Sequence, residues 1–267
     1  MLTVKDFPKM KADGKIITSL TAYDYSSAQL TELAGVDFIL VGDSLGMVVL
    51  GYESTIQVTM EDMLHHIKAV KRGTKDTFIV ADMPYKSFHI STERTKENAF
   101  RLIIEGGANA VKLEGGTSSR LDAIRAIVDC EIPVVAHLGL TPQSVNKFGG
   151  YKVQGKAELE YQKLIQQSKD VEEAGAFMLV LEGIPEQLGK EISETLTIPT
   201  IGIGAGRYTD GQILVYHDLL GLTALEPKFL KKYTMLNDEI VKAVAQYVSE
   251  VREKKFPQEK HVYFPIK

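Results

Sequence analysis

The sequence of 267 residues contains no tryptophan and only one cysteine, Cys130. A single cysteine excludes an internal disulfide, and we therefore expect a reducing, cytoplasmic location. Cys130 itself is expected to be a core or helix-end residue.

Long apolar runs and an excess of basic residues are also missing. No stretch approaches the roughly 20 apolar residues that span a bilayer, and the N-terminal segment has no apolar core typical of a secretory signal. Lysine and arginine number 31 against 35 acidic residues, which gives a net charge of −4 and no positive field for nucleic acid. We expect neither a membrane nor a nucleic acid among the partners of this protein.

The remaining composition is that of an ordinary globular domain, with 44% apolar residues. No linker and no break in composition divides the chain, so we expect one domain over residues 1–267. The length is close to the roughly 250 residues of a (β/α)8 barrel.

Short apolar segments without polar alternation recur along the chain and are typical of strands buried on both faces. We expect strands at 15–23, 38–41, 77–81, 110–113, 132–136, 177–181, 198–201 and, least clearly, 213–216. Amphipathic helices are expected between and after them at 25–33, 60–73, 92–105, 118–128, 157–173, 186–195 and 236–255. This alternation predicts parallel strands with right-handed crossovers. The number of units favours an α/β fold of the (β/α)8 TIM barrel type over an open doubly wound sheet.

Ionisable residues follow six of these segments at the strand ends, namely Asp24, Asp43, Asp82, Glu114, His137 and Glu182. In a barrel these positions converge on one mouth, where barrel enzymes build their active sites. Asp43, Asp82 and Glu114 come from three successive strands and should be neighbours on the rim. Carboxylates in contact need a shared cation or raised pKa values, and oxygen ligands suit a hard cation. We therefore expect Mg²⁺ at Asp43, Asp82 and Glu114.

Four further residues have more than one interpretation. Glu182, two strands beyond Glu114, is a candidate general base, a neighbour of a helix N-cap or a salt-bridge partner. Lys112 points to the same side of its strand as Glu114 and would hold an oxyanion, form a Schiff base or pair with an acid. His137 would ligate a metal, donate to a carboxylate or be satisfied at a strand end. Ser44 would bind a substrate carboxylate or cap a helix.

The glycine run at 202–206 reads GIGAG and fits neither a dinucleotide fingerprint nor a phosphate-binding P-loop. Two long loops, at 42–58 and 141–155, lack a clear period and are candidates for a cover over the site.

Five motifs in this order carry a family resemblance: VGDSLGMVVLGYEST, ADMPY, AVKLEGG, AHLGLTPQS and IGIGAG. With them the chain resembles the ketopantoate hydroxymethyltransferase family, of the phosphoenolpyruvate/pyruvate barrel type, from the first strand to about Glu226. The resemblance implies transfer of a one-carbon unit from 5,10-methylenetetrahydrofolate to 3-methyl-2-oxobutanoate through a Mg²⁺-stabilised enolate. The product would be 2-dehydropantoate, an intermediate of pantothenate biosynthesis.

The resemblance also implies roles for the residues at the strand ends. Mg²⁺ would be held by Asp43, Asp82 and Glu114, and Glu182 would be the catalytic base. The oxoacid would be bound by Asp43, Ser44, Asp82 and Lys112, with His137 as a further donor. The partners would be the 2-oxoacid and the folate, in a cytoplasmic homodecamer of two pentameric rings.

Three alternatives stay open at this point. A Mg²⁺-dependent 2-oxoacid lyase of the same barrel type is the nearest, although such enzymes often carry a cysteine at the active-site face, whereas Cys130 precedes a strand. An aldolase with Lys112 as Schiff base is the second. A non-catalytic barrel that binds an anion or supports an oligomer is the third.

Overall fold

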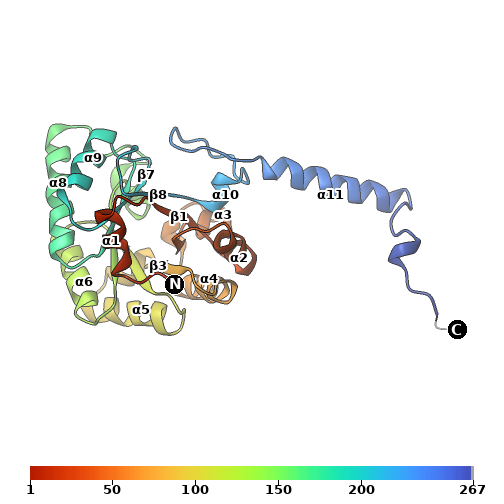
Figure 1. The fold of residues 1–267 in the computed structure, drawn as a ribbon, viewed down its shortest axis with the longest axis horizontal. Helices are drawn as coiled ribbons and strands as arrows, with labels where there is room; N and C mark the ends of the chain where they lie inside the picture. Colours follow the sequence, from red (N-terminus) through yellow and green to blue (C-terminus); the bar gives the residue numbers. More distant parts are fainter. Residues whose placement is uncertain (266–267) are drawn as a thin grey trace. The chain divides into compact units, whose positions relative to one another are not determined.

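The computed structural model describes residues 1–265. Eight strands form a closed, all-parallel barrel in sequence order, with β8 paired to β1. Figure 1 shows the helices around these strands. The predicted (β/α)8 barrel is therefore confirmed.

The strands are β1 Ile17–Thr21, β2 Phe38–Val41, β3 Phe78–Asp82, β4 Ala110–Glu114, β5 Val134–Gly139, β6 Met178–Glu182, β7 Thr200–Ile203 and β8 Gly211–Leu214. The longer helices are α2 Tyr25–Leu33, α4 Met60–Gly73, α5 Thr92–Ile104, α6 Ser118–Val128, α8 Glu158–Glu173, α9 Glu186–Thr195 and α11 Leu236–Arg252. The shorter α-helices are α1 Asp6–Ala12, α3 Leu45–Val48, α7 Val145–Phe148 and α10 Tyr216–Leu219. The 3-10 helices are η1 Thr55–Gln57, η2 Tyr85–Phe88, η3 Pro142–Ser144 and η4 Glu259–His261.

Several strand boundaries differ from the prediction. Strands β5 and β7 begin two residues later than expected, each just after a proline, Pro133 or Pro199, whose nitrogen has no hydrogen to donate to the ladder. Strand β5 also continues through His137 to Gly139. Strands β3, β4 and β6 each include the acid that was expected to follow them. The ladder therefore fixes the backbone of these functional residues.

The two expected loops contain short helices. Within 42–58 the chain forms α3 and η1, and within 141–155 it forms η3 and α7. The prediction also omitted α1, of whose residues only Phe7 is buried. Helices of three to seven residues span too few turns to show a readable 3.6-residue period.

The barrel interior changes character along its axis. At the amino-terminal end, Phe7 of α1 lies edge-on to Phe38 and Phe78, with ring centroids 5.9 and 5.1 Å apart. Alternate residues of β3 then read Phe78, Val80 and Asp82, all buried. Because the side-chain period of a strand is two, Asp82 points to the same side as the aromatic plug. The barrel is therefore apolar at one end and ionisable at the other.

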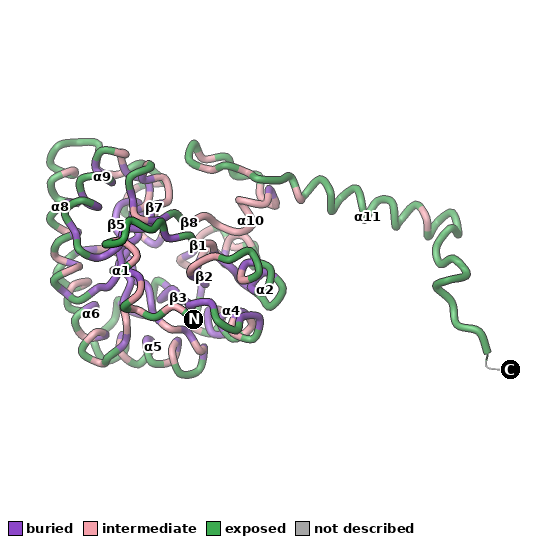
Figure 2. Tube along the Cα trace, viewed as in Figure 1, coloured by how far each residue is buried: buried purple, intermediate pink, exposed green. Residues whose placement is uncertain are grey.

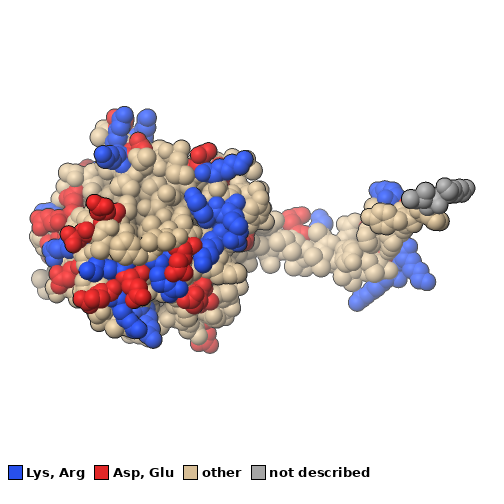
Figure 3. Space-filling model, turned by 90° about the horizontal axis from the view of Figure 1, so that it is seen from below, with Lys and Arg blue, Asp and Glu red and all other residues tan. Residues whose placement is uncertain are grey.

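A second apolar layer lies between the strands and the surrounding helices. Figure 2 shows buried strands beneath helices whose outer faces are exposed. Helix α4 is typical: Met63, Ile67 and Val70 face the core, while Thr59 and Asp62 form a capping box at its start. Figure 3 shows acidic and basic side chains interspersed over one face, as the near-balanced composition predicts.

The chain divides into two compact units, Met1–Tyr216 and His217–Lys267. The first contains the whole barrel. In the second, α11 has no buried residue. The expectation of one domain over residues 1–267 therefore stays a prediction. Among the described residues no helix is both long and apolar enough to cross a membrane.

Candidate active site

The register of the barrel brings the predicted residues together. Asp82 on β3 pairs with Lys112 on β4, Glu114 pairs with His137 on β5, and Gly139 pairs with Glu182 on β6. Side chains one step apart across a ladder are close neighbours. The carboxyl ends of β3 to β6 thus form a continuous ionisable row.

Contacts between these side chains join the row. Lys112 Nζ lies 2.8 Å from Asp82 Oδ1 and 3.2 Å from His137 Nδ1. The same ring nitrogen lies 3.4 Å from Glu114 Oε1, and His137 Nε2 lies 3.2 Å from Glu182 Oε2. Two carboxylates therefore flank the imidazole, one at each nitrogen.

Asp43 enters the site just beyond the end of β2. Its backbone N–H donates to Asp82 Oδ2 at 3.0 Å, which fixes the two acids next to each other. A side chain at Gly42 would place a Cβ 2.9 Å from Ser44 Oγ and 3.4 Å from Asp82 Oδ2. Glycine at this position keeps space open beside the acids.

Two residues that were not predicted complete the arrangement. Gln143, in η3, donates from Nε2 to Asp43 Oδ2 at 2.8 Å and from its backbone N–H to Glu114 Oε2 at 3.0 Å. Tyr23, fully buried, shares a 2.7 Å hydrogen bond between its hydroxyl and Ser44 Oγ. Gln143 belongs to the LGLTPQS motif, which was the available signal, whereas nothing in the sequence marked Tyr23.

Asp24 does not belong to this cluster. It is exposed and caps α2, where its Oδ1 accepts from the backbone N–H of Ser27 at 2.7 Å. In the sequence it follows a strand in the same way as Asp43. Local capping therefore explains it without a role in the site.

Burial and like charge shift the protonation of the acids. Burial, together with the charges of Asp82 and Glu114, raises the pKa of Asp43 well above its usual range. Burial also raises the pKa of Asp82, although the Lys112 ammonium opposes that shift. Negative charge is therefore in excess around Asp43.

The two basic groups are held in their charged forms. Burial alone would lower the pKa of Lys112, but the charges of Asp82, Glu114 and Asp43 outweigh it and raise that pKa. Burial and Lys112 would lower the pKa of His137, yet hydrogen bonds to Glu114 and Glu182 raise it to about 9. A Schiff base requires a neutral amine, so this environment disfavours the aldolase alternative for Lys112.

The acids at this mouth are candidate ligands for a cation. Within residues 1–265, no group of three His, Cys, Asp or Glu side chains is arranged as a ready-made metal site. The buried acids Asp43 and Asp82 nevertheless lie next to each other, and among the described residues only Lys112 forms an ion pair with either of them. Mg²⁺ commonly takes one or two carboxylates with water and substrate oxygens. The donor set thus fits Mg²⁺, and the predicted set of three ligands stays a prediction.

The two long loops meet beside the site. Tyr151 OH lies 3.8 Å from Met47 Sδ, which joins the segment after β5 to helix α3. Burial and the charges of Asp43, Glu182 and Glu114 raise the pKa of Tyr151, which places its hydroxyl within reach of their field.

Known proteins resemble this chain over most of its length. The family model of ketopantoate hydroxymethyltransferase matches residues 1–259. The chain belongs to the ketopantoate hydroxymethyltransferase family.

Relatives of similar length carry the corresponding name. A protein of Bacillus cereus and one of Bacillus anthracis, both named 3-methyl-2-oxobutanoate hydroxymethyltransferase, are each 58% identical to it over 265 residues. The match covers 98% of this chain and 95% and 94% of those two proteins. The prediction of a hydroxymethyltransferase is confirmed.

Solved structures share the barrel at low sequence identity. A phosphonopyruvate hydrolase in complex with oxalate and Mg²⁺ is 14% identical, with a TM-score of 0.64 over 99% of this chain and 92% of its own. A 2,3-dimethylmalate lyase of the phosphoenolpyruvate mutase/isocitrate lyase superfamily is 14% identical, with a TM-score of 0.62 over 98% and 93%. At this identity the likeness shows the fold alone.

Proposed function

We propose that this protein transfers a hydroxymethyl group from 5,10-methylenetetrahydrofolate to 3-methyl-2-oxobutanoate and so forms 2-dehydropantoate. The observation that carries the proposal is the buried row from Asp82 through Lys112 and His137 to Glu182. Within this row Lys112 provides a cation for an anionic substrate, and Glu182 provides a carboxylate at the end of the row. The names of the 58% identical relatives supply the substrate.

Lys112 and Ser44 are proposed to hold the oxoacid. Lys112 is a buried ammonium, and the substrate carboxylate would add a further negative partner to it. The Ser44 hydroxyl, held by Tyr23, would donate to the same carboxylate. His137 would donate toward the 2-oxo oxygen as negative charge develops there.

Asp43 and Asp82 would hold Mg²⁺, with Glu114 as the third predicted ligand. Their excess of negative charge is the feature that supports this assignment. When bound, the ion supplies a Lewis acid next to the oxygens of the oxoacid. Gln143, which donates to Asp43 and Glu114, would orient both carboxylates.

Glu182 is proposed as the general base. Its side chain is 16% exposed, against 4% for Glu114, so it is the more accessible of the two acids beside His137. Its carboxylate would take the proton from C3, and the electron pair of that C–H bond would move into the C2–C3 bond as the oxygen gains charge. C3 would then form a bond to the methylene carbon, which loses its bonds to the two folate nitrogens. One water molecule supplies the hydroxyl oxygen, the proton from C3 and one proton from water end on the two nitrogens, and tetrahydrofolate leaves.

The decisive experiment separates proton abstraction from carbon transfer. The protein is incubated with Mg²⁺ and 3-methyl-2-oxobutanoate in D₂O without folate, and C3–H exchange is followed by NMR. Glu182→Gln should abolish exchange and retain Mg²⁺ binding, whereas the control Glu186→Gln, at an exposed ion pair with Arg207, should exchange normally. Exchange at the parental rate in Glu182→Gln would remove Glu182 from this role.

A second experiment tests the metal assignment. Mg²⁺ affinity is measured by calorimetry for Asp82→Ala and for the control Asp122→Ala, an exposed residue of α6. We expect Asp82→Ala to lose the binding and the control to keep it. An unchanged titration for Asp82→Ala would refute the proposed ligand. Addition of the folate donor to the parent protein should then yield 2-dehydropantoate.

A Mg²⁺-dependent 2-oxoacid lyase remains the alternative, since the barrel is shared with such enzymes. Cys130 follows α6 and precedes β5, at the end of the barrel opposite the site. Cleavage of a 2,3-dialkylmalate without hydroxymethyl transfer would favour the lyase.

The same proposal includes a cytoplasmic homo-oligomer, specifically a decamer of two pentameric rings. The single cysteine supports the compartment. Exposed apolar side chains on one face of α11 support the assembly, among them Ile240, Val244 and Val251. Analytical ultracentrifugation tests it: Val244→Asp should lower the mass of the assembly, and Lys242→Glu on the same helix should not.

A further inference from the structure

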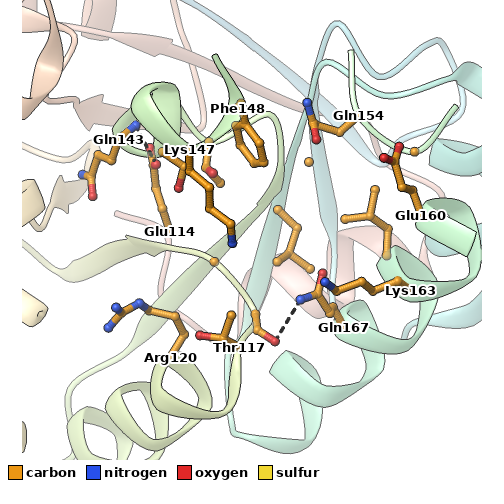
Figure 4. Close-up of a pocket in the computed structure, with 18 of the residues that line it drawn as sticks. Glu114, Thr117, Arg120, Gln143, Lys147, Phe148, Gln154, Glu160, Lys163 and Gln167 are labelled. Atoms are coloured by element: carbon orange, nitrogen blue, oxygen red, sulfur yellow. Dashed lines mark hydrogen bonds between the residues drawn. The ribbon is translucent and has the colours of Figure 1, made fainter. Parts of the chain in front are cut away.

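A cavity of about 440 Å³ adjoins the active site on the side of Glu114. Glu114 and Gln143 line the cavity and also belong to the active site. The other walls come from the segment after β4, from α7 and from the first half of α8, as Figure 4 shows. The cavity therefore leads from the reaction centre outward to the exposed face of α8.

The outer part of this cavity is rich in unpaired positive charge. Arg120, Lys147 and Lys163 lie in its walls, and in the described part of the chain none of them has a carboxylate within ion-pair distance. In Figure 4 Arg120 and Lys163 flank the cavity from opposite sides, on α6 and α8, while Lys147 extends into it from above. Apart from Glu114, one wall carboxylate faces them, that of Glu160. This arrangement favours an anionic occupant.

Arg120 is held in place rather than free to reach a distant acid. Its Nη1 donates to the carbonyl oxygen of Phe88 at 2.9 Å, and its guanidinium carbon lies 5.1 Å from the centre of the Phe88 ring. Burial lowers its pKa, because the charge has lost water without gaining a carboxylate. A bound anion would restore that partner.

The inner end of the cavity lies at Gln143. Gln143 Oε1 is buried, and among residues 1–265 it has no hydrogen-bond partner. The other atoms of this amide are committed to Asp43 and to the carbonyl oxygen of Met83. This amide is therefore directed toward the active-site acids, and Gln143 marks the place where the cavity meets the active site.

We infer that this cavity is the subsite for the folate donor, with the pteridine ring at Gln143 and the glutamate carboxylates at Arg120, Lys147 and Lys163. The inference rests on the proposed function. The reactive methylene group is attached to the pteridine end, which must approach the oxoacid, while the glutamate lies at the opposite end of the molecule. The charge of the cavity follows the same direction, with Glu114 at the inner end and the three cations in the outer part.

Binding of tetrahydrofolate and of tetrahydropteroate, which lacks the glutamate, tests the outer part. Both are titrated by calorimetry into the protein with Mg²⁺ and 3-methyl-2-oxobutanoate. We expect the parent protein to prefer tetrahydrofolate by about fivefold per ion pair formed. In Lys147→Gln/Lys163→Gln that preference should fall to at most the roughly fivefold of a single ion pair, that with Arg120. Lys169→Gln, an exposed position on the same α8, should keep it.

Equal preference in the double variant and the parent would overturn the subsite, as would failure of both ligands to bind. C3–H exchange needs no folate and reports on the proposed function separately. Normal exchange with no loss of preference would reject the subsite alone. Absent exchange in the parent with the expected loss of preference would reject the proposed reaction and leave the subsite standing.

Discussion

Lys112 Nζ and Asp82 Oδ1 form a 2.8 Å ion pair with both side chains about 95% buried. The register places them directly opposite each other on β3 and β4. Removal of one partner of a buried pair leaves an uncompensated charge, which typically costs about 3–5 kcal/mol. The pair therefore links the substrate-binding chemistry to the stability of the barrel.

Lys112→Met should lower the free energy of unfolding by about 3 kcal/mol, since Asp82 would remain buried near Asp43 and Glu114. Urea unfolding without divalent cations measures this loss. The control Lys190→Met removes the exposed pair with Glu194 and should cost under about 1 kcal/mol. A similar small loss for both variants would show that the buried pair is not structurally important.

Gln143→Leu should weaken Mg²⁺ binding about 10- to 100-fold, the usual effect of removing a residue that orients metal ligands. The change removes the donor to Asp43 Oδ2 and keeps the backbone bond to Glu114. Calorimetric Mg²⁺ titration measures it, with Gln162→Leu on the surface of α8 as the control. If Gln143→Leu bound Mg²⁺ as tightly as the parent protein, Gln143 would have only a packing role.

The protonation of His137 should make stability depend on pH. Its pKa is raised to about 9 in the folded protein, above the roughly 6.5 of an unfolded histidine. The proton therefore stabilises the fold fully below about pH 6.5, and this contribution disappears as the pH rises through about 9.

Urea unfolding between pH 6 and 9.5 without divalent cations tests this dependence. The parent protein should lose stability over that window, and His137→Gln should lack that component. Exposed His261, replaced by glutamine, serves as the control and should follow the parent. Equal slopes for the parent and His137→Gln would contradict a protonated imidazole, and NMR titration of the ring gives the pKa directly.

Phe7→Ala should destabilise the barrel by about 3–5 kcal/mol, because it empties a fully buried site between Phe38, Phe78 and Phe177. The plug lies at the end of the barrel opposite the ionisable row. The rate of C3–H exchange at low temperature should therefore change little. Phe100→Ala, at a position 40% exposed, is the stability control. A large loss of exchange with unchanged stability would contradict this separation.

The sequence predicted the barrel because its pattern is local. Each strand, such as 38–41, is an apolar run, and each long helix carries its own amphipathic stripe, so element type follows from neighbours along the chain. Boundaries were less accurate where prolines removed backbone donors, as at Pro133 and Pro199. Helices as short as α3 gave no periodic signal at all.

The residues of the site were predictable where an ionisable side chain comes at the end of a strand. Asp43, Asp82, Glu114, His137 and Glu182 were all placed at one mouth from the unit count, and the structure brings them together. Asp24 satisfied the same pattern and instead caps a helix. The pattern alone does not distinguish these outcomes, because local capping competes with the shared mouth.

By itself, the sequence determined the family, the strand-and-helix order and the inward side of Lys112 relative to Glu114, since a period of two is a property of the single strand. Only the tertiary structure decided that Gln143 connects Asp43 with Glu114, that Tyr23 holds Ser44, and that His137 lies between two carboxylates. These contacts join segments up to 100 residues apart. Closure of the barrel sets their distances, and no local pattern in the chain records it.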